Sequence, residues 1–369
     1  MTIVVPTFRP RLPAAETLLP FLREIDAHRW YSNFGPLNRR FESALAEHFR
    51  APRGTVVSVA NATLGMSLAL QDAAHDAAGF CMVPAWTHAA TAAAIVAAGL
   101  TPWFVDVDAR SWQLTPDAAR RLLAAAPERP LAVLAVSPFG GFVDAEAWDR
   151  YTDDTGIPVV IDAAAAFDTV RPARTTVQVV SLHATKAFGI GEGGLMLVGD
   201  ERRAERLRRM SNFGLDRDRK TVLPGTNAKL SEYAAAVGLA RLQEWPTCRA
   251  QLIATARRFL TGLAALPGVA PMPALDGATA ITTANVILPR GNADAVIAFL
   301  RDRGIEARKW WAGACHRHPQ FAACPRASLD VTEELADRVL GLPFFADITD
   351  EQLRLVFDEL RAALASGPA

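Results

Sequence analysis

The sequence predicts an α/β protein whose mostly parallel central sheet is covered by helices, followed by a smaller α+β unit. Short runs rich in β-branched residues alternate with helical stretches between residues 56 and 198. This alternation is typical of a parallel sheet covered on both faces. The pattern changes after Trp245-Pro246. We therefore expect a large domain, 1–245, that includes the N-terminal segment, and a small C-terminal domain, 246–369.

Composition and charge exclude several classes of protein. Half of the 369 residues are hydrophobic, which is enough for a large core, and 39 basic side chains balance 39 acidic ones. This balance argues against nucleic-acid binding and against a polybasic membrane surface. The first six residues lack the pattern of a signal peptide, and the longest apolar run, 89–100, is too short to span a bilayer. The four cysteines are scattered without a Cys-x-x-Cys pair, so we expect a cytoplasmic location.

The first half of the chain offers a candidate phosphate site. Amphipathic helices are expected over 13–28 and 37–49, and a strand over 56–59 leads into a helix that starts near Asn61. A helix N-terminus presents free N–H groups and a positive dipole end, which suit a phosphate. The alternative is ordinary capping of the helix by Asn61, and the residues alone favour it.

A carboxylate ends another predicted strand, 158–162. Asp162 at the carboxyl end of a buried parallel strand points to the usual ligand crevice of such sheets. Burying this charge alone would be costly, so a partner is expected, and a protonated ring nitrogen of a cofactor would serve. The alternative is an aspartate that caps the next helix.

The loop 181–194 lies between two strand-like runs, 177–180 and 195–198, and holds one lysine, one glutamate and four glycines. Glycines allow sharp turns and a close approach of the backbone to a ligand. A lysine in such an apolar setting is a candidate for a lowered pKa and for amine chemistry. The alternative is a β-hairpin loop with a solvated lysine.

The segment Ser181-Leu-His-Ala-Thr-Lys186, followed by Gly191-Glu-Gly-Gly194, resembles the cofactor-lysine segment of the DegT/DnrJ/EryC1/StrS family. These are pyridoxal-phosphate (PLP) sugar aminotransferases with the aspartate-aminotransferase fold, PLP fold type I. The resemblance runs through nearly the whole chain. It implies that Lys186 holds PLP covalently. Some relatives carry histidine at this position and act as dehydratases, so lysine favours transamination.

The resemblance also assigns the groups that would hold the cofactor. Asp162 would keep the pyridine nitrogen protonated, and His88 stands where the family carries an aromatic residue on the ring face. The phosphate would be held by residues of three segments, namely Ala62 and Thr63, Ser181, and Asn227 from the partner chain of a homodimer. Ala62 replaces the usual glycine of the phosphate motif. Ala165 replaces a glutamine or histidine that would reach the ring oxygen, which is the clearest departure from the family pattern.

The connection after residue 309 is rich in aromatic and histidine residues. By resemblance, Trp310, Trp311 and His316 would line the sugar pocket. His316 and His318 could also be interpreted as metal ligands, but no cysteine or carboxylate cluster supports that, and we expect no metal.

Together these features predict a cytoplasmic, homodimeric, PLP-dependent aminotransferase of amino-sugar biosynthesis. The expected donor is L-glutamate and the expected acceptor a nucleotide-linked keto sugar, a dTDP-4-keto-6-deoxyhexose. Two alternatives stay open: an aminotransferase for a 3-keto sugar or a cyclitol ketone, and a PLP-binding regulatory protein on the same fold that has lost catalysis. An α/β oxidoreductase lacks support, because no Gly-x-Gly-x-x-Gly motif follows an early strand.

Overall fold

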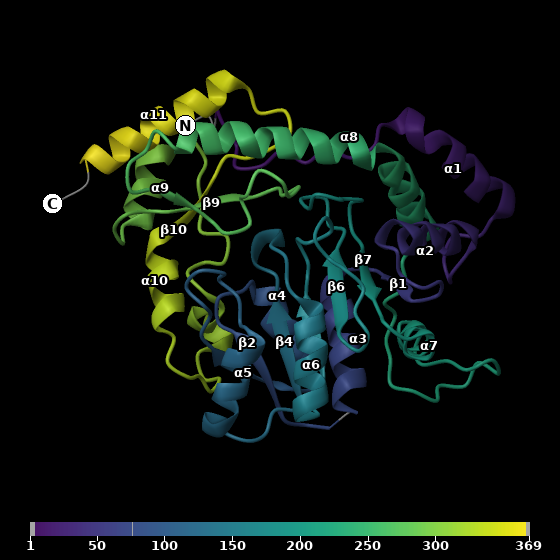
Figure 1. The fold of residues 1–369 in the computed structure, drawn as a ribbon. Coiled ribbons are helices and arrows are strands. Elements are labelled where there is room, and N and C mark those ends of the chain that lie inside the picture. Colours follow the sequence, from purple (N-terminus) through teal and green to yellow (C-terminus); the bar gives the residue numbers. More distant parts are fainter. Residues whose placement is uncertain (1–3, 76, 367–369) are drawn as a thin grey trace.

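The computed structural model describes residues 4–75 and 77–366 (Figure 1). Residues 1–3, on which part of the signal-peptide argument depends, lie outside the described residues, as do 76 and 367–369. The predicted α/β class is confirmed, with one seven-stranded sheet and one three-stranded sheet. Within 4–75 and 77–366, none of the helices combines the length and the hydropathy that crossing a bilayer requires.

The large sheet brings the carboxyl ends of most of its strands to one edge. Its strand order is β1 (Val56–Val59), β7 (Gly194–Leu197), β6 (Val177–Ser181), β5 (Val159–Asp162), β4 (Ala132–Val136), β2 (Phe80–Pro84), β3 (Thr101–Val105). Strand β7 runs antiparallel to both of its neighbours, and the pairs from β6 to β3 are parallel. Ligand sites of parallel sheets lie at this edge.

Helices cover both faces of this sheet, and hence its strands are buried β-branched runs. One face is covered by α3 (Ala62–Ala74), α4 (Ala89–Ala97) and α7 (Glu201–Met210). The other face is covered by α2 (Pro36–Phe49), α5 (Pro116–Leu122) and α6 (Ala145–Thr155). The first helix, α1 (Ala15–His28), lies beside α2 and contacts α8. Each face therefore has its own apolar core.

The long helix α8 (Glu232–Leu263) differs from the prediction, because it runs through the expected boundary at Trp245-Pro246 as one helix (Figure 1). Proline removes one helical hydrogen bond, which costs stability. Here Trp245 is buried, and its ring contacts those of Phe167 and Phe188 at centroid distances of 4.9 and 5.7 Å. We attribute the continuity of α8 to this packing, which outweighs the local preference.

The C-terminal unit contains a three-stranded antiparallel sheet of order β10 (Val339–Leu342), β9 (Ala284–Ile287), β8 (Ala270–Pro271). Three helices complete it, namely α9 (Ala293–Arg301), α10 (Asp330–Arg338) and α11 (Asp350–Ser366). Isolated bridges join Ile305 to Val5 and Arg308 to Gly341. The amide of Thr7 donates to Glu306 over 2.9 Å. The N-terminal segment therefore pairs with the C-terminal unit. The domain boundary after residue 245 remains a prediction.

Candidate active site

Four strands deliver the predicted site residues to the same edge of the large sheet. Asn61 follows β1, His88 follows β2, Asp162 ends β5, and Ser181 ends β6. Two backbone bonds lock the neighbouring strand ends together, from Ala163 N to the carbonyl of Val179 and from Ser181 N to that of Ala164. The sheet therefore fixes the relative positions of these side chains before any ligand binds.

The loop that carries Lys186 is held by backbone hydrogen bonds. Lys186 N donates to the carbonyl of His183, and Ala184 N donates to that of Gly191. A Cβ on Gly189 would lie 2.6 Å from the carbonyl oxygen of Ala184, so only glycine fits there. The loop thus presents Lys186 from a fixed backbone rather than from a mobile hairpin.

The amine of Lys186 has a pKa below its usual value. The main cause is its removal from water, and the nearby carboxylate of Asp162 opposes the shift by favouring the charged form. A lowered pKa increases the fraction of neutral amine near neutral pH, and the neutral amine is the nucleophile and the base. Lys186 is therefore suited to amine chemistry.

Asp162 is buried and held by two donors. The hydroxyl of Thr91 donates to Oδ2 over 2.7 Å, and the amide of Ala164 donates to Oδ1 over 3.0 Å. Thr91 also shares a 2.7 Å hydrogen bond with the hydroxyl of Thr87. These two threonines were not predicted as site residues. The feature of the sequence that could have identified them is their position at the start of α4, where polar side chains are common.

His88 caps α4, because its Nδ1 accepts a hydrogen bond from the amide of Ala90 over 3.1 Å. Its pKa lies below the usual value, first through partial desolvation and then through the positive charge of Lys186. His88 therefore lies within electrostatic reach of Lys186 and Asp162, as its predicted role on the cofactor ring requires. Trp86, two residues earlier, is a packing residue, with its ring 5.0 Å from that of Trp311.

The N-terminus of α3 forms the candidate phosphate cradle. Asn61 caps the helix by accepting from the amide of Leu64 over 2.9 Å, so the capping role is confirmed. Ala62 and Thr63 form the first turn, where helical N–H groups lack intrahelical partners. A Cβ on Gly194 would lie 2.7 Å from the amide nitrogen of Ala62, so this glycine lets β7 approach the helix start closely. Ser181 is nearly buried.

Asn227 is oriented by Lys229. The ammonium of Lys229 donates to Oδ1 of Asn227 over 2.7 Å and to Oδ1 of Asn212 over 2.8 Å. The Asn227 amide NH₂ is thereby turned away from the lysine. Asn227 lies on the exposed part of the chain before α8, where a second chain could reach it.

The three predicted sugar-pocket residues do not gather in one place. Trp311 stacks on Phe139 with ring centroids 4.0 Å apart, and Trp310 lies 5.8 Å from Phe8. His316 is buried and bonds Glu333 through Nε2 over 2.7 Å. It lines a separate pocket, whose other lining residues are Arg317, Ala322, Arg326, Ala327, Leu329, Asp330 and Glu333.

Burial lowers the pKa of His316 to about 4, so its imidazole is neutral at pH 7. Within the described part of the chain, no group of three histidine, cysteine or acidic residues is arranged to hold a metal ion.

The donor set at the sheet edge fits PLP. A buried carboxylate suits the pyridine nitrogen, a lysine amine of lowered pKa suits the aldehyde carbon, and a helix N-terminus with adjacent hydroxyls suits the phosphate. By the resemblance, the residue that would reach the ring oxygen is Ala165, whose side chain offers no hydrogen bond. Each chemical part of the cofactor except this oxygen thus has a matching group.

Comparisons with known proteins show which family and which relatives the chain resembles. A profile described as the DegT/DnrJ/EryC1/StrS aminotransferase family matches residues 14–361. The chain is 30% identical to the Mycobacterium tuberculosis protein Rv3402c, with 98% of this chain and 91% of the relative covered. It is 27% identical to an Escherichia coli dTDP-4-amino-4,6-dideoxy-D-glucose transaminase, with 94% and 95% covered.

Two solved structures are similar over almost their whole length. A putative PLP-dependent aminotransferase from Bacillus cereus ATCC 10987 has a TM-score of 0.90 at 30% identity, covering 96% of this chain and 99% of that one. The structure of DesI in the presence of its TDP-sugar product has a TM-score of 0.84 at 33% identity, covering 98% and 93%. The protein is a PLP-dependent aminotransferase, and it belongs to the DegT/DnrJ/EryC1/StrS family. Its fold is that of the fold type I aminotransferases.

Proposed function

We propose that this protein transfers an amino group from L-glutamate to a dTDP-4-keto-6-deoxyhexose and acts as a homodimer with PLP. The observation that carries the proposal is the placement of Lys186 near Asp162 at the carboxyl edge of the sheet, where the pKa of the lysine amine is lowered. The match to a family of sugar aminotransferases supports a sugar as the acceptor.

Lys186 would hold PLP and perform the proton transfers. Bound PLP supplies an electron sink that lets the donor α-carbon lose its proton. Nζ of Lys186 accepts that proton as general base, and later donates a proton to the sugar carbon that becomes aminated. Desolvation lowers the pKa of this amine, which favours the neutral form that serves as the base.

Asp162, Thr91 and His88 would orient the ring. The Asp162 carboxylate keeps the pyridine nitrogen protonated, and Thr91 fixes the carboxylate through its 2.7 Å hydrogen bond. Ala62, Thr63 and Ser181 would hold the phosphate at the start of α3, next to β6. His88 would cover one face of the ring with its imidazole.

A homodimer would complete the site with Asn227 from the partner chain. Tyr31 and Tyr233 stack with ring centroids 6.2 Å apart, and both remain almost half exposed. Phe213, beside the hydrogen-bonded group of Asn227, Lys229 and Asn212, is similarly exposed. Exposed aromatic residues of this kind are typical of protein–protein contacts, and they support an interface on this side of the molecule.

The acceptor assignment rests on similarity. The Escherichia coli relative is a transaminase that forms a 4-amino-4,6-dideoxy sugar on dTDP, and DesI has a TDP-sugar product. The role of Trp310, Trp311 and His316 in lining the sugar pocket stays a prediction, since the three side chains face different neighbours in this chain.

The experiment is a paired assay with L-glutamate and either dTDP-4-keto-6-deoxyglucose or its 3-keto isomer. The product is identified by NMR, which locates the carbon that carries the new amine. Amination at C4 with little turnover of the 3-keto sugar supports the proposal, whereas preferential amination at C3 replaces the acceptor assignment. If neither sugar reacts and glutamate gives no 2-oxoglutarate, the assignment of the donor and the acceptor fails, and a different amino donor or a non-catalytic PLP-binding protein replaces it.

A further inference from the structure

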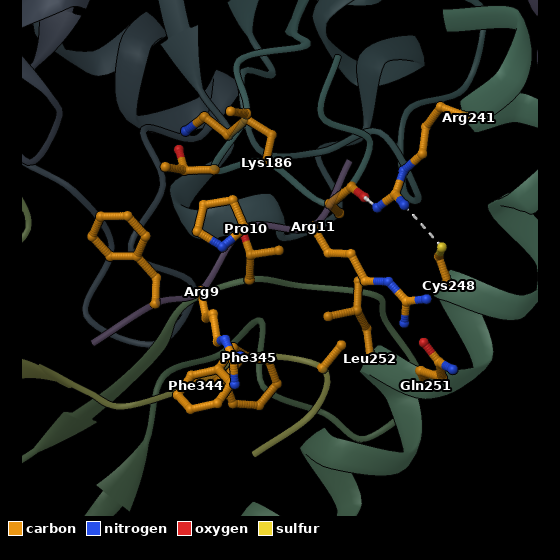
Figure 2. A pocket seen from close by; sticks show the side chains of 16 residues that line it. Arg9, Pro10, Arg11, Lys186, Arg241, Cys248, Gln251, Leu252, Phe344 and Phe345 are labelled. Carbon is orange, nitrogen blue, oxygen red and sulfur yellow. Dashed lines mark hydrogen bonds between the residues drawn. The ribbon is translucent and has the colours of Figure 1, made fainter. Parts of the chain in front are cut away.

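A second pocket lies behind the loop that carries Lys186 (Figure 2). It is a recess, partly open to solvent, lined by segments 8–11, 184–187 and 344–346, by Thr282 and by α8. Figure 2 shows the Lys186 amine directed away from Arg241 and Cys248. Lys186 itself lines the recess, but its amine points away from the part of the wall that Arg241 and Cys248 form.

Positive charge dominates the wall of this recess. Arg9, Arg11 and Arg241 line it, and none of its sixteen described lining residues is an aspartate or a glutamate. The nearest carboxylates lie outside the wall. Glu244 is 3.8 Å from Arg241, which is beyond hydrogen-bond distance, and Asp347 pairs with the exposed Arg9 over 3.4 Å. The recess is thus an electropositive concavity, which attracts anions.

Arg241 is the buried centre of this charge. Only 6% of its surface is exposed. One terminal nitrogen donates to the carbonyl of Ala187 over 3.0 Å and the other to Sγ of Cys248 over 2.9 Å, whereas its buried Nε has no hydrogen-bond partner among the described residues. A buried guanidinium with an unused donor, paired only with Glu244 at 3.8 Å, is costly unless an anion completes it.

Arg11, in the N-terminal segment, lines the same recess as Arg241. Its charge is one cause, after burial, of the lowered pKa of Arg241, so the two guanidinium groups repel each other across the recess. In Figure 2 the Arg11 side chain extends toward Cys248 and Gln251. An anion between Arg11 and Arg241 would remove this repulsion and gain charge-assisted hydrogen bonds from both.

We propose that this recess binds a small organic anion whose carboxylate or phosphate head group lies between Arg241 and Arg11, with its apolar part against Leu252 and Phe345. Arg241 also donates to the carbonyl of Ala187, the residue after Lys186. A bound anion would therefore contact a guanidinium that is hydrogen-bonded to the lysine loop.

Cys248 provides a local probe, because it lines the recess and is partly exposed. The PLP-loaded enzyme is alkylated with iodoacetamide in succinate, in inorganic phosphate or in chloride at matched ionic strength, and the modified peptides are quantified by mass spectrometry. Matched ionic strength removes the effect of general screening. At ten times the dissociation constant, alkylation of Cys248 should slow about tenfold. Cys324, also partly exposed but outside this recess, is the internal control and should not slow.

Arg11→Gln is the decisive variant, because Arg11 is exposed and its loss leaves the core intact. We expect it to raise the anion concentration for half protection about tenfold. Arg121→Gln, another exposed arginine on α5, should leave it unchanged. Stronger protection by succinate identifies a carboxylate head group, and stronger protection by phosphate identifies a phosphate. No saturable protection of Cys248, equal slowing of Cys324, or full protection in Arg11→Gln would overturn the proposal, whatever the enzyme does with keto sugars.

Discussion

The hydroxyl of Thr91 donates a 2.7 Å hydrogen bond to Oδ2 of Asp162, so the first turn of α4 fixes the carboxylate that ends β5. The second Asp162 oxygen accepts from the amide of Ala164. Thr87 supports Thr91 in turn through a further 2.7 Å bond. The carboxylate assigned to the cofactor nitrogen is therefore set in place by the protein alone.

Replacing Thr91 with valine tests this relationship. Valine keeps the shape but removes the donor, so we expect glutamate turnover to fall about tenfold and PLP to bind more weakly. Thr91→Ser retains the hydroxyl and should keep most of the activity. Steady-state rates and PLP titration measure both effects. Wild-type values for Thr91→Val would mean that the hydrogen bond does not position Asp162.

Asp162→Asn keeps the size of the side chain and removes its charge. We expect the glutamate half-reaction to slow at least about a hundredfold, because the pyridine nitrogen would no longer be held protonated. Stopped-flow absorbance measures this rate. Asp168→Asn is the matched control, since this carboxylate pairs with Arg249 over 2.6 Å and has no role at the cofactor. Equal slowing in both variants would contradict the assignment.

The lowered pKa of Lys186 predicts a pH-dependent stability in protein freed of PLP. The pKa of Lys186 in the folded state lies below its value in the unfolded chain. At pH values between these two pKa values the unfolded chain binds more protons, so the stability of the folded state rises with pH. Lys186→Met should therefore be more stable than wild type at neutral pH, and the difference should shrink as pH rises toward the unfolded lysine pKa. Urea denaturation over this pH range measures it. Lys220→Met, at an exposed lysine, is the control. If the stability difference for Lys186→Met did not depend on pH, the lowered pKa of Lys186 would be contradicted.

Glu232 joins the start of α8 to the start of α2. It is almost fully buried, and its two oxygens accept from the amides of Leu37 and Asn38 over 2.8 and 2.9 Å. We expect Glu232→Ala to lower the free energy of unfolding by about 2 kcal/mol, because two buried helix-start donors lose their acceptor. Glu232→Gln keeps one acceptor and should cost less. Chemical denaturation tests this order, and equal costs would argue against the capping role.

Much of the fold was predictable, because local patterns and tertiary structure agree. The buried β-branched strands, the Asn61 cap of α3 and the capping box of α11 are all present, the last with Thr349 and Gln352 exchanging hydrogen bonds. The sequence missed the continuity of α8, because Pro246 is a local signal and the packing of Trp245 is not. It also missed the pairing of Val5 with Ile305, a contact between residues 300 positions apart.

The candidate site was predictable where one residue carries the chemistry. Asp162 ends β5, and Lys186 lies in the loop after β6, and the residue pattern of both strands is plain. Thr91 and Arg241 were not singled out, since a threonine or an arginine on a helix gains meaning only from what it faces. His316 shows the converse, because its place in an aromatic segment did not indicate that it would turn toward Glu333.

The most direct test of the account is the visible absorption spectrum of purified protein with PLP, before and after L-glutamate, beside Lys186→Ala. We predict a band from lysine-bound PLP that glutamate bleaches, that a keto sugar restores, and that Lys186→Ala cannot form. A band in Lys186→Ala equal to that of wild type, or no band in folded wild-type protein, would contradict the assignment of Lys186 as the residue that holds the cofactor.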